Sequence, residues 1–333
     1  MSERKLIISG FGTVGRSLVR EIIERRLYNV LRVVALIDSR GAVINSNGFT
    51  PDDLVRLLNV PRGGLSRYPK YGLPNLNTKS VVREVEADVL VELTPSNYET
   101  GEPGVSNVLE AIRLGLNVVL ANKSPIALLG LSLLIRAKEA GVQLLYRATV
   151  MGGTPLIPLI KSIRNSVKRV YGVLNATTNY ILTSMYEHEE SFEQALKRAQ
   201  ERGIAEADPR LDIDGFDPAA KLSILACTLG HDLRIGNVIR ESMRVIKLED
   251  VISKKRENKV PKYMARLEVN ESNVNASVKV EYISNNDFLS KVKDYYNGVY
   301  IETINNKIFL MGIGAGGKAT AESVLEDILS ITR

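Results

Sequence analysis

The chain has 333 residues, of which 44% are hydrophobic and 25% charged, values that are typical of a globular protein with one large or two smaller domains. No apolar run is long enough to span a bilayer, and the start, MSERKLIISG, lacks the longer apolar segment of a signal peptide, so we expect a cytoplasmic protein that binds no membrane. The net charge is +6, but the basic residues are spread along the chain and only 6% of residues are aromatic, which argues against a nucleic-acid partner.

The first segment has the pattern of a dinucleotide-binding domain. An apolar strand, KLIISG, leads into GFGTVG, and a helical pattern follows. In this fingerprint the first glycine allows the tight turn, the second lets the backbone approach a pyrophosphate, and the third lets the helix pack closely on the strand. The helix start then supplies N–H groups to the phosphates. We therefore expect the cofactor to bind at Gly10, Gly12, Thr13, Val14 and Gly15.

The second strand, VLRVVALID, ends in a pair of residues that bear on the choice of cofactor. Asp38 at the strand end is suited to the ribose hydroxyls of NAD, whereas Arg40 is suited to the 2′-phosphate of NADP. The pair leaves NAD and NADP both open. Residues 61–80, rich in Gly, Pro and Asn, are predicted to form a surface loop.

Strands and helices then alternate up to about residue 147, which predicts a parallel sheet with right-handed crossovers. Ligands of such sheets bind beyond the carboxyl ends of the strands. Thr94 follows one buried strand and is placed for the nicotinamide half of a cofactor. Lys123 follows the next strand, NVVLA, with Ser124 as the expected N-cap of a helix and Pro125 as its first residue. The last strand of this part is expected at VQLLYRATV.

The pattern changes in the second half of the chain. A strand, KRVYGVLN, is expected to exit into ATTN, a small polar loop that can offer N–H groups to a carboxylate, and two helices follow. Beyond residue 235, alternating and β-branched segments separated by Asn-rich turns predict a mostly antiparallel sheet. The fold class is thus α/β, with a Rossmann-type parallel sheet followed by an α+β domain.

An acidic stretch, residues 199–221, contains five carboxylates after Gly203 and ends in one lysine, Lys221. Two Asp-Pro pairs predict turns, and Asp217 is the expected N-cap of an apolar helix with Pro218 at its first position. Lys221 then lies on the first helical turn. Such a loop suits a substrate with an ammonium group and a proton transfer. The alternative is a solvated acidic loop with ordinary helix capping.

The chain resembles the homoserine dehydrogenases over nearly its whole length, in the short monofunctional form without a C-terminal ACT domain. The resemblance is carried by GFGTVG, ELTPSNYETGEP, LANKSP, NATTNYIL and, most specifically, by the stretch from Ala199 to Lys221. It implies the NAD(P)-dependent interconversion of L-aspartate 4-semialdehyde and L-homoserine, and a homodimer. It also implies a discontinuous dinucleotide-binding domain, residues 1–147 and 313–333, around a substrate-binding and dimerisation domain, residues 148–312.

The resemblance assigns roles by motif position. It implies Lys221 and Asp217 as the catalytic pair, and Lys123 as a second lysine with a catalytic or cofactor-binding role. The substrate-binding positions that it implies are Glu206, Asp212 and Thr177. Positions near the cofactor are Gly203 and Gly314.

One departure from the family concerns a monovalent cation site. Relatives often have glutamate where this chain has Arg147, and the carbonyls of such a site would belong to Val150, Gly152 and Thr154. Because arginine carries the wrong charge, we predict that no metal is bound here.

Two other functions are considered. An aspartate-semialdehyde dehydrogenase needs a thiolate, but the single cysteine, Cys227, lies in an apolar helical run. An NAD(P)-binding sensor protein without turnover would not need both lysines and the whole acidic motif.

Overall fold

The computed structural model describes residues 3–270 and 273–332. The chain forms two compact units. The first unit comprises Met1–Pro125, Ser132–Gly152 and Gly316–Arg333, and the second comprises Ile126–Leu131 and Gly153–Ala315. Within the described ranges, no helix has the length and apolar character needed to cross a membrane.

The first unit is built on a seven-stranded sheet with the order β4-β3-β2-β1-β5-β6-β7. The strands from β2 to β7 in this order are parallel, whereas β3 and β4 run antiparallel to their neighbours. The parallel strands are apolar and buried, as expected for strands covered on both faces. The bounds are β1 Arg4–Ser9, β2 Leu31–Asp38, β3 Gly41–Ile44, β4 Gly72–Pro74, β5 Val89–Glu92, β6 Asn117–Leu120 and β7 Leu144–Leu145.

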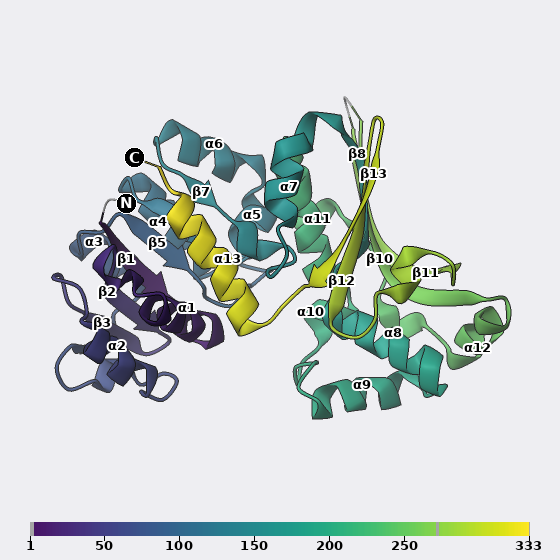
Figure 1. The fold of residues 1–333 in the computed structure, drawn as a ribbon, viewed down its shortest axis with the longest axis horizontal. Coiled ribbons are helices and arrows are strands. Elements are labelled where there is room, and N and C mark those ends of the chain that lie inside the picture. Colours follow the sequence, from purple (N-terminus) through teal and green to yellow (C-terminus); the bar gives the residue numbers. More distant parts are fainter. Residues whose placement is uncertain (1–2, 271–272, 333) are drawn as a thin grey trace. The chain divides into compact units, whose positions relative to one another are not determined.

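Helices pack on this sheet through apolar faces, and the last helix, α13, lies beside the first, α1 (Figure 1). Leu18 and Ile22 of α1 and Val324 and Ile328 of α13 are buried in the same core. The helices of this unit are α1 Thr13–Glu24, α2 Pro51–Leu58, α3 Thr78–Glu84, α4 Gly104–Arg113, α6 Leu131–Glu139 and α13 Gly317–Ser330. Helix α5, Ser124–Leu129, begins in the first unit, but its residues from Ile126 on belong to the second.

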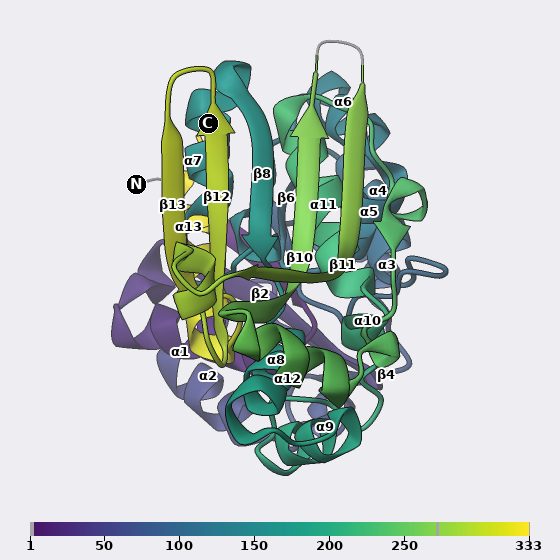
Figure 2. The same cartoon turned by 90° about the vertical axis from the view of Figure 1, so that its right-hand side faces the viewer.

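The second unit contains a six-stranded sheet with the order β13-β12-β8-β10-β11-β9, in which all pairs except β11 with β9 are antiparallel. In Figure 2 this sheet faces the viewer, with α7 and α11 behind it. The predicted combination of a mostly parallel and a mostly antiparallel sheet is confirmed. The strands are β8 Val167–Val173, β9 Ile239–Arg240, β10 Lys259–Val269, β11 Val274–Ser284, β12 Tyr296–Thr303 and β13 Lys307–Ile313. The helices are α7 Leu156–Ile163, α8 Ala176–His188, α9 Phe192–Glu201, α10 Arg210–Ile213, α11 Phe216–Leu229 and α12 Leu248–Arg256.

Two local predictions in the first unit were wrong. Residues 61–80 are more than a loop, because they contain a 3₁₀ turn at Leu65–Arg67, the strand β4 and the start of α3. The strand expected at 142–150 is only two residues long, and Arg147–Thr149 forms a 3₁₀ turn. The reason is that β7 is an edge strand, and beyond it the Arg147 N–H donates to Asp327 Oδ2 of α13 at 2.7 Å instead of to a neighbouring strand.

Candidate active site

A cavity of about 560 Å³ lies at the carboxyl end of β1 in the first unit. In the sheet, β1 lies between β2 and β5. The strand order therefore extends from β1 to one side through β2 and to the other side through β5, and dinucleotides bind at such a reversal of strand order. Gly10 has φ +101°, and a Cβ there would lie 2.7 Å from the Leu93 backbone. A Cβ on Gly15 would lie 2.4 Å from the Gly10 carbonyl oxygen, whereas Gly12, which lines the cavity, has nothing within 4 Å. The backbone at Gly12 is therefore open to a phosphate group at the start of α1, and the cavity fits a dinucleotide.

Asp38 is fixed in orientation at the end of β2. Its Oδ1 accepts from the Arg40 N–H at 2.9 Å, and its Oδ2 accepts from the Leu65 N–H at 3.0 Å. Arg40 lines the same cavity with an exposed side chain, as does Arg62, whose Nη2 donates to Thr13 Oγ1 at 2.6 Å. Sequence reasoning missed Arg62 because its segment was assigned to a loop, although the tripeptide Arg-Gly-Gly beside a cofactor domain was a usable signal.

Three other residues that were predicted near the cofactor differ from one another in their surroundings. Thr94 lines the cavity, donates its hydroxyl to Glu92 and accepts from Asn122 Nδ2 at 3.0 Å. Val14 packs against the core, so its side chain is not directed to a ligand. Lys123 is half-buried between β6 and α5, and its N–H donates to Ser96 Oγ at 3.0 Å. The helix after it begins at Ser124 rather than at Pro125.

In the second unit, the helix α11 begins earlier than predicted. Gly215, with φ +78°, is its N-cap, so Asp217 lies inside the first turn and Lys221 lies one turn further on. A Cβ on Gly215 would come within 2.5 Å of the Tyr263 hydroxyl oxygen. The prediction that Asp217 caps the helix was wrong because the glycine both adopts the left-handed conformation and leaves room for Tyr263.

The segment ATTN was predicted to be a loop, but this was wrong. It forms the first turn of α8. Asn175 caps this helix, with its Oδ1 accepting from the Thr178 N–H at 2.9 Å. Thr177 is buried on the same turn, and its hydroxyl donates to the Ile204 carbonyl at 3.2 Å. The backbone N–H groups of a helix start are therefore available where the loop was expected.

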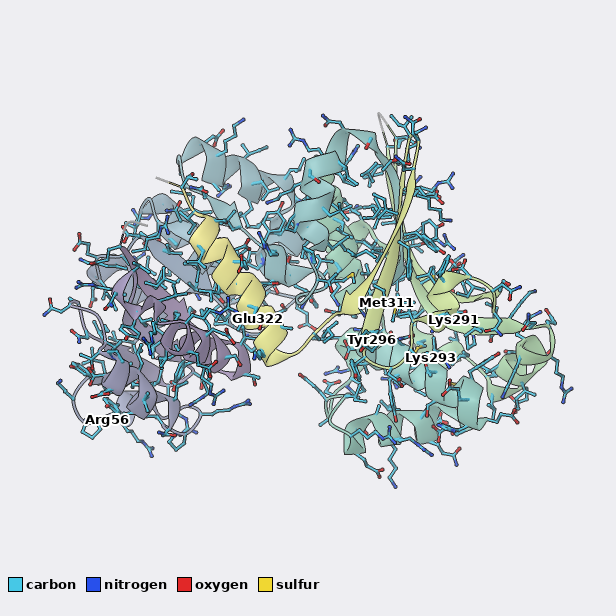
Figure 3. The ribbon with its side chains drawn as sticks, in the orientation of Figure 1. Arg56, Lys291, Lys293, Tyr296, Met311 and Glu322 are labelled. Carbon is cyan, nitrogen blue, oxygen red and sulfur yellow. The ribbon has the colours of Figure 1, made fainter. Side chains whose placement is uncertain are left out.

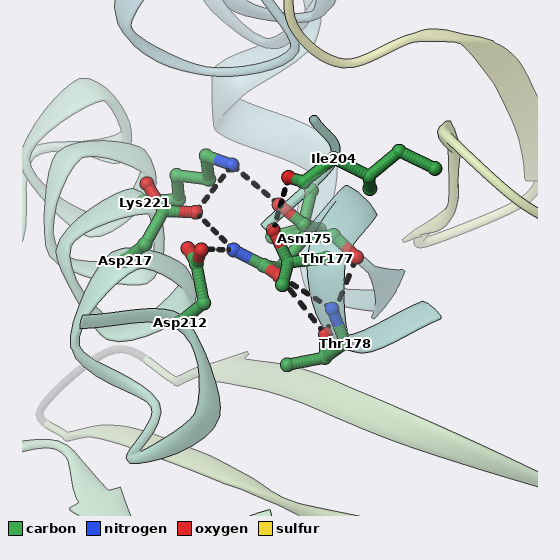
Figure 4. Close-up of polar contacts among 8 residues, drawn as sticks. Asn175, Thr177, Thr178, Ile204, Asp212, Asp217 and Lys221 are labelled. Atoms are coloured by element: carbon green, nitrogen blue, oxygen red, sulfur yellow. Dashed lines mark hydrogen bonds and ion pairs between the residues drawn. The ribbon is translucent and has the colours of Figure 1, made fainter. Parts of the chain in front are cut away.

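The starts of α8 and α11 meet in a buried polar network (Figure 4). Lys221, which is only 6% exposed, pairs through Nζ with Asp217 Oδ2 at 2.7 Å and also donates to the Leu174 carbonyl. Asn175 Nδ2 donates to Asp212 Oδ1 at 2.7 Å and to Asp217 Oδ2 at 2.9 Å. The structure thus brings together Lys221, Asp217 and Asp212, which were predicted, through Asn175, which was not.

The electrostatics of the network concentrate negative charge. Burial raises the pKa of Asp212, and the charge of Asp217 raises it further, while hydrogen bonds from Asn175 and Thr177 act in the opposite direction. Lys221 is the cation that offsets the two carboxylates in this network.

The remaining acidic residues of the motif make different contacts. Asp208 forms a bidentate pair with Arg210, with a closest distance of 2.6 Å, and this pair lowers the pKa of Asp208 to about 2. Asp214 accepts from the Ser242 hydroxyl at 2.6 Å. Glu206 has an exposed side chain, and its carbonyl accepts from Gln200 Nε2 at 3.2 Å.

The two further glycines predicted near the cofactor both lie just outside regular elements. Gly203 follows α9 with φ +68°. Gly314 follows β13, where a Cβ would lie 1.7 Å from Asn297 Oδ1. A side chain at Gly314 would require Asn297 to move, whereas at Gly203 it would meet no neighbour but would adopt a left-handed conformation that favours glycine.

Arg147 has a carboxylate partner of its own. Its Nε lies 3.3 Å from Asp327 Oδ1, and the Gly152 carbonyl nearby in the chain accepts from the Ser323 hydroxyl. The Thr154 hydroxyl donates to the Ile313 carbonyl at 3.2 Å, and Val150 is buried. Asp327 therefore offsets the positive charge of Arg147, which was not foreseen from the sequence.

Comparisons with known proteins identify the class of protein. The family model described as homoserine dehydrogenase matches residues 155–329, and that of glutamate/leucine/phenylalanine/valine dehydrogenase matches residues 1–97. The chain is an NAD(P)-dependent oxidoreductase that acts on a CH–OH group.

Relatives along the whole chain identify the family. The chain is 35% identical to a homoserine dehydrogenase of Methanocaldococcus jannaschii, with 98% of each chain covered. It is 34% identical to an NAD(+)-dependent homoserine dehydrogenase of Pseudomonas canavaninivorans, with 99% of this chain and 97% of the relative covered. A hyperthermophilic archaeal homoserine dehydrogenase solved in complex with NADPH superimposes with a TM-score of 0.84 at 31% identity, covering 98% and 97% of the two chains. The chain belongs to the homoserine dehydrogenase family.

The resemblance predicted from the motifs is therefore confirmed, and with it the activity. The enzyme interconverts L-homoserine and L-aspartate 4-semialdehyde with NAD or NADP, a step in the biosynthesis of threonine, methionine and isoleucine. The thiolate alternative is not supported by the site, because burial raises the pKa of the Cys227 thiol to about 12.

Proposed function

We propose that Lys221 transfers the proton in the interconversion of aspartate 4-semialdehyde and homoserine, with Asp217 holding its ammonium group in place. The observation that carries this proposal is the buried ion pair between Lys221 Nζ and Asp217 Oδ2, at 2.7 Å. A buried lysine held by a carboxylate one turn earlier in its own helix is a proton donor in a fixed position, as general acid–base catalysis requires.

The nicotinamide ring supplies the hydride when the cofactor is bound. In the direction of reduction, Lys221 donates a proton to the aldehyde oxygen as negative charge develops there, so that an alcohol forms. In the direction of oxidation, the neutral lysine accepts the hydroxyl proton. Asp217 stabilises the charged form of Lys221 in both directions, and the hydrogen bond to the Leu174 carbonyl restricts its side chain.

The carboxylates serve the other end of the substrate. Asp212 and Glu206 bind the α-ammonium group, which explains why negative charge is concentrated beside a single lysine. Thr177, on the first turn of α8, places backbone N–H groups near the α-carboxylate. The reacting carbon is thereby directed to Lys221 rather than to the acidic side chains.

The cofactor occupies the cavity of the first unit. Gly10, Gly12 and Gly15, with Thr13 and Val14, provide the turn and the helix start that bind the pyrophosphate, and Thr94 lies at the nicotinamide half. Asp38 accepts from the ribose hydroxyls. Arg40 and Arg62 both line the cavity beside it, so two guanidinium groups are available to a 2′-phosphate, which favours NADP over NAD.

Lys123, Gly203 and Gly314 complete the proposed assignments. Lys123 lies between β6 and α5 and serves as a second lysine for catalysis or cofactor binding. Gly203 and Gly314 let the backbone approach the cofactor. In this scheme residues 1–147 and 313–333 form the cofactor domain, and residues 148–312 form the substrate-binding and dimerisation domain. The enzyme works in the cytoplasm, where a biosynthetic reductase draws on NAD(P)H.

The chain forms a homodimer through the second unit. Tyr300 of β12 lies directly opposite Phe309 of β13, with the two tilted rings at a centroid distance of 5.1 Å, and Phe288 stacks on Phe309 at 5.6 Å. Phe288 is 65% exposed and Met311, on the neighbouring strand β13, is 41% exposed. Arginines accompany the aromatic rings, as Arg266 does over Tyr171 at 5.0 Å. A sheet face with this composition is typical of a protein interface.

The test of the proposed roles compares two buried lysines of the second unit. Lys221→Met should reduce turnover of homoserine with NADP by about 10² or more, because proton transfer contributes 10²–10⁴-fold. Lys262→Met is the matched control, since Lys262 is also buried but lies on β10 and bonds to Asn179 and Val292. Near-normal turnover in Lys221→Met, or an equal loss in both variants, would reject Lys221 as the proton donor.

A further inference from the structure

The amide of Asn175 is the point at which the acidic side chains of the substrate site meet. One of its two N–H groups is directed to Asp212 Oδ1 at 2.7 Å and the other to Asp217 Oδ2 at 2.9 Å. The same oxygen of Asp217 accepts from Lys221 at 2.7 Å. Figure 4 shows the amide nitrogen between the two carboxylates, with Lys221 on the far side of Asp217.

The orientation of this amide is determined by the helix that it caps. Asn175 Oδ1 accepts from the Thr178 N–H at 2.9 Å and from the Thr178 hydroxyl at 3.1 Å. Because the Thr178 backbone N–H can only donate, the oxygen of the amide must face α8 and its nitrogen must face the acids. The side chain is 4% exposed and is thus held from two directions.

The carboxylates of Asp212 and Asp217 accept from the same amide nitrogen and therefore lie close together. Two such carboxylates repel each other, and one of them tends to take up a proton. The charged groups around the amide are Asp212 of α10 and Asp217 and Lys221 of α11. Hydrogen bonds that favour the ionised form oppose proton uptake, and Asn175 gives one to each carboxylate. Burial and then the charge of Asp217 raise the pKa of Asp212, and the hydrogen bond from Asn175 acts in the opposite direction.

We propose that Asn175 is a positioning residue for the reaction, because its amide keeps Asp212 and Asp217 ionised together and holds Asp217 against Lys221. The inference rests on the roles proposed above for these three residues. Asp212 then retains the charge that binds the substrate ammonium group, and Asp217 retains the charge that pairs with the catalytic lysine.

Asn175→Ser separates this role from helix capping. A serine hydroxyl caps a helix about as well as an asparagine amide, so α8 keeps an acceptor for the Thr178 N–H. However, one hydroxyl on a shorter side chain cannot donate to both carboxylates. We expect turnover to fall about tenfold or more and the acidic limb of kcat/KM against pH to move up by about one unit, the size of one lost hydrogen bond to an ionised group.

A second measurement does not depend on activity. The melting temperature of the serine variant should fall further below that of the parent enzyme near neutral pH than in mild acid, because the lost donor matters only to ionised carboxylates. The control is Val251→Ala, which removes buried methyl groups from α12 of the same unit and takes no hydrogen bond from a carboxylate. This variant should lower the melting temperature by an amount that does not depend on pH over the same range, with an unchanged pH profile of activity.

The outcomes distinguish this inference from the proposed function. If Lys221→Met abolishes turnover while Asn175→Ser leaves the pH profile unmoved, Asn175 is only a helix cap and the inference is wrong. If Lys221→Met retains turnover, the proposed catalytic roles themselves fail. Asn175→Thr, which also caps the helix without an amide, replaces the serine variant should that variant not fold.

Discussion

Because Lys262 is a buried lysine, we predict that the free energy of unfolding rises with pH in the alkaline range. This lysine of β10 is 1% exposed, and its Nζ donates to Asn179 Oδ1 of α8 at 3.0 Å and to the Val292 carbonyl. Burial, and then the charge of Lys293, lower the pKa of Lys262 from 10.5 to about 8. Lys293, which lies just before β12, and Tyr296, the first residue of β12, are labelled in Figure 3.

The magnitude follows from these two pKa values. One pH unit corresponds to about 1.4 kcal/mol, so keeping Lys262 charged in the folded enzyme costs about 3 kcal/mol. Below about pH 8 the group is protonated in both states and the full cost applies. Between pH 8 and 10.5 the folded chain has released a proton that the unfolded chain still binds, and the free energy of unfolding therefore rises with pH.

The assay is urea unfolding at a fixed protomer concentration, comparing the parent enzyme with Lys262→Met at about pH 7, 8.5 and 10. Methionine removes the charge but leaves the acceptors on Asn179 and Val292 without this donor, which costs about 1–3 kcal/mol at every pH. Relative to the variant, the parent enzyme should gain about 2–3 kcal/mol from neutral to alkaline pH. A difference between the two proteins that stays constant over this range would refute the reasoning.

Three other predictions concern the cofactor, the cation and the dimer. Arg40→Ala should raise the KM for NADP about tenfold or more and that for NAD little, whereas an equal loss for both would mean that Arg40 does not bind the 2′-phosphate. Titrating KCl or NaCl against a large organic cation at constant ionic strength should leave turnover unchanged because of Arg147, and saturable activation by the small cation would show that a site survives. Met311→Asp should shift the mass measured by light scattering toward the monomer, since it buries a charge in the proposed interface, and an unchanged mass at low protein concentration would exclude this face.

Much of the first unit was predictable because its signals are local. The strand, the glycine turn and the helix from residue 4 to 24 are contiguous, and each glycine has a backbone reason that can be stated from spacing alone. The signal for the start of α2 is equally local, because Thr50 and Asp53, three residues apart, form a capping box. In contrast, β3 and β4 are short strands at one edge of the sheet, and their residues are too few to show a period.

The parts of the site that were missed depend on contacts between distant segments. The start of α11 is determined by Gly215 in contact with Tyr263, a residue 48 positions later in the numbering. Asn175 acts on Asp212 and Asp217, which follow it by 37 and 42 residues. No local pattern indicates such pairs. The family motif pointed to Lys221, Asp217 and Asp212. However, it gave no reason why the carboxylates of Asp212 and Asp217 can lie so close together.

The arrangement of the helices supplies part of that reason. Asp217 lies in the first turn of α11, and Asp212 and Asp217 both contact the residue that caps α8. The start of a helix carries partial positive charge and unpaired N–H groups, so two helix starts that meet at one point stabilise anions there. A single lysine is then enough to offset two buried carboxylates, and the site retains negative charge, as the proposed binding of a substrate ammonium group requires. On this argument, changes that displace the start of α8 or α11 weaken substrate binding even when every acidic side chain is kept.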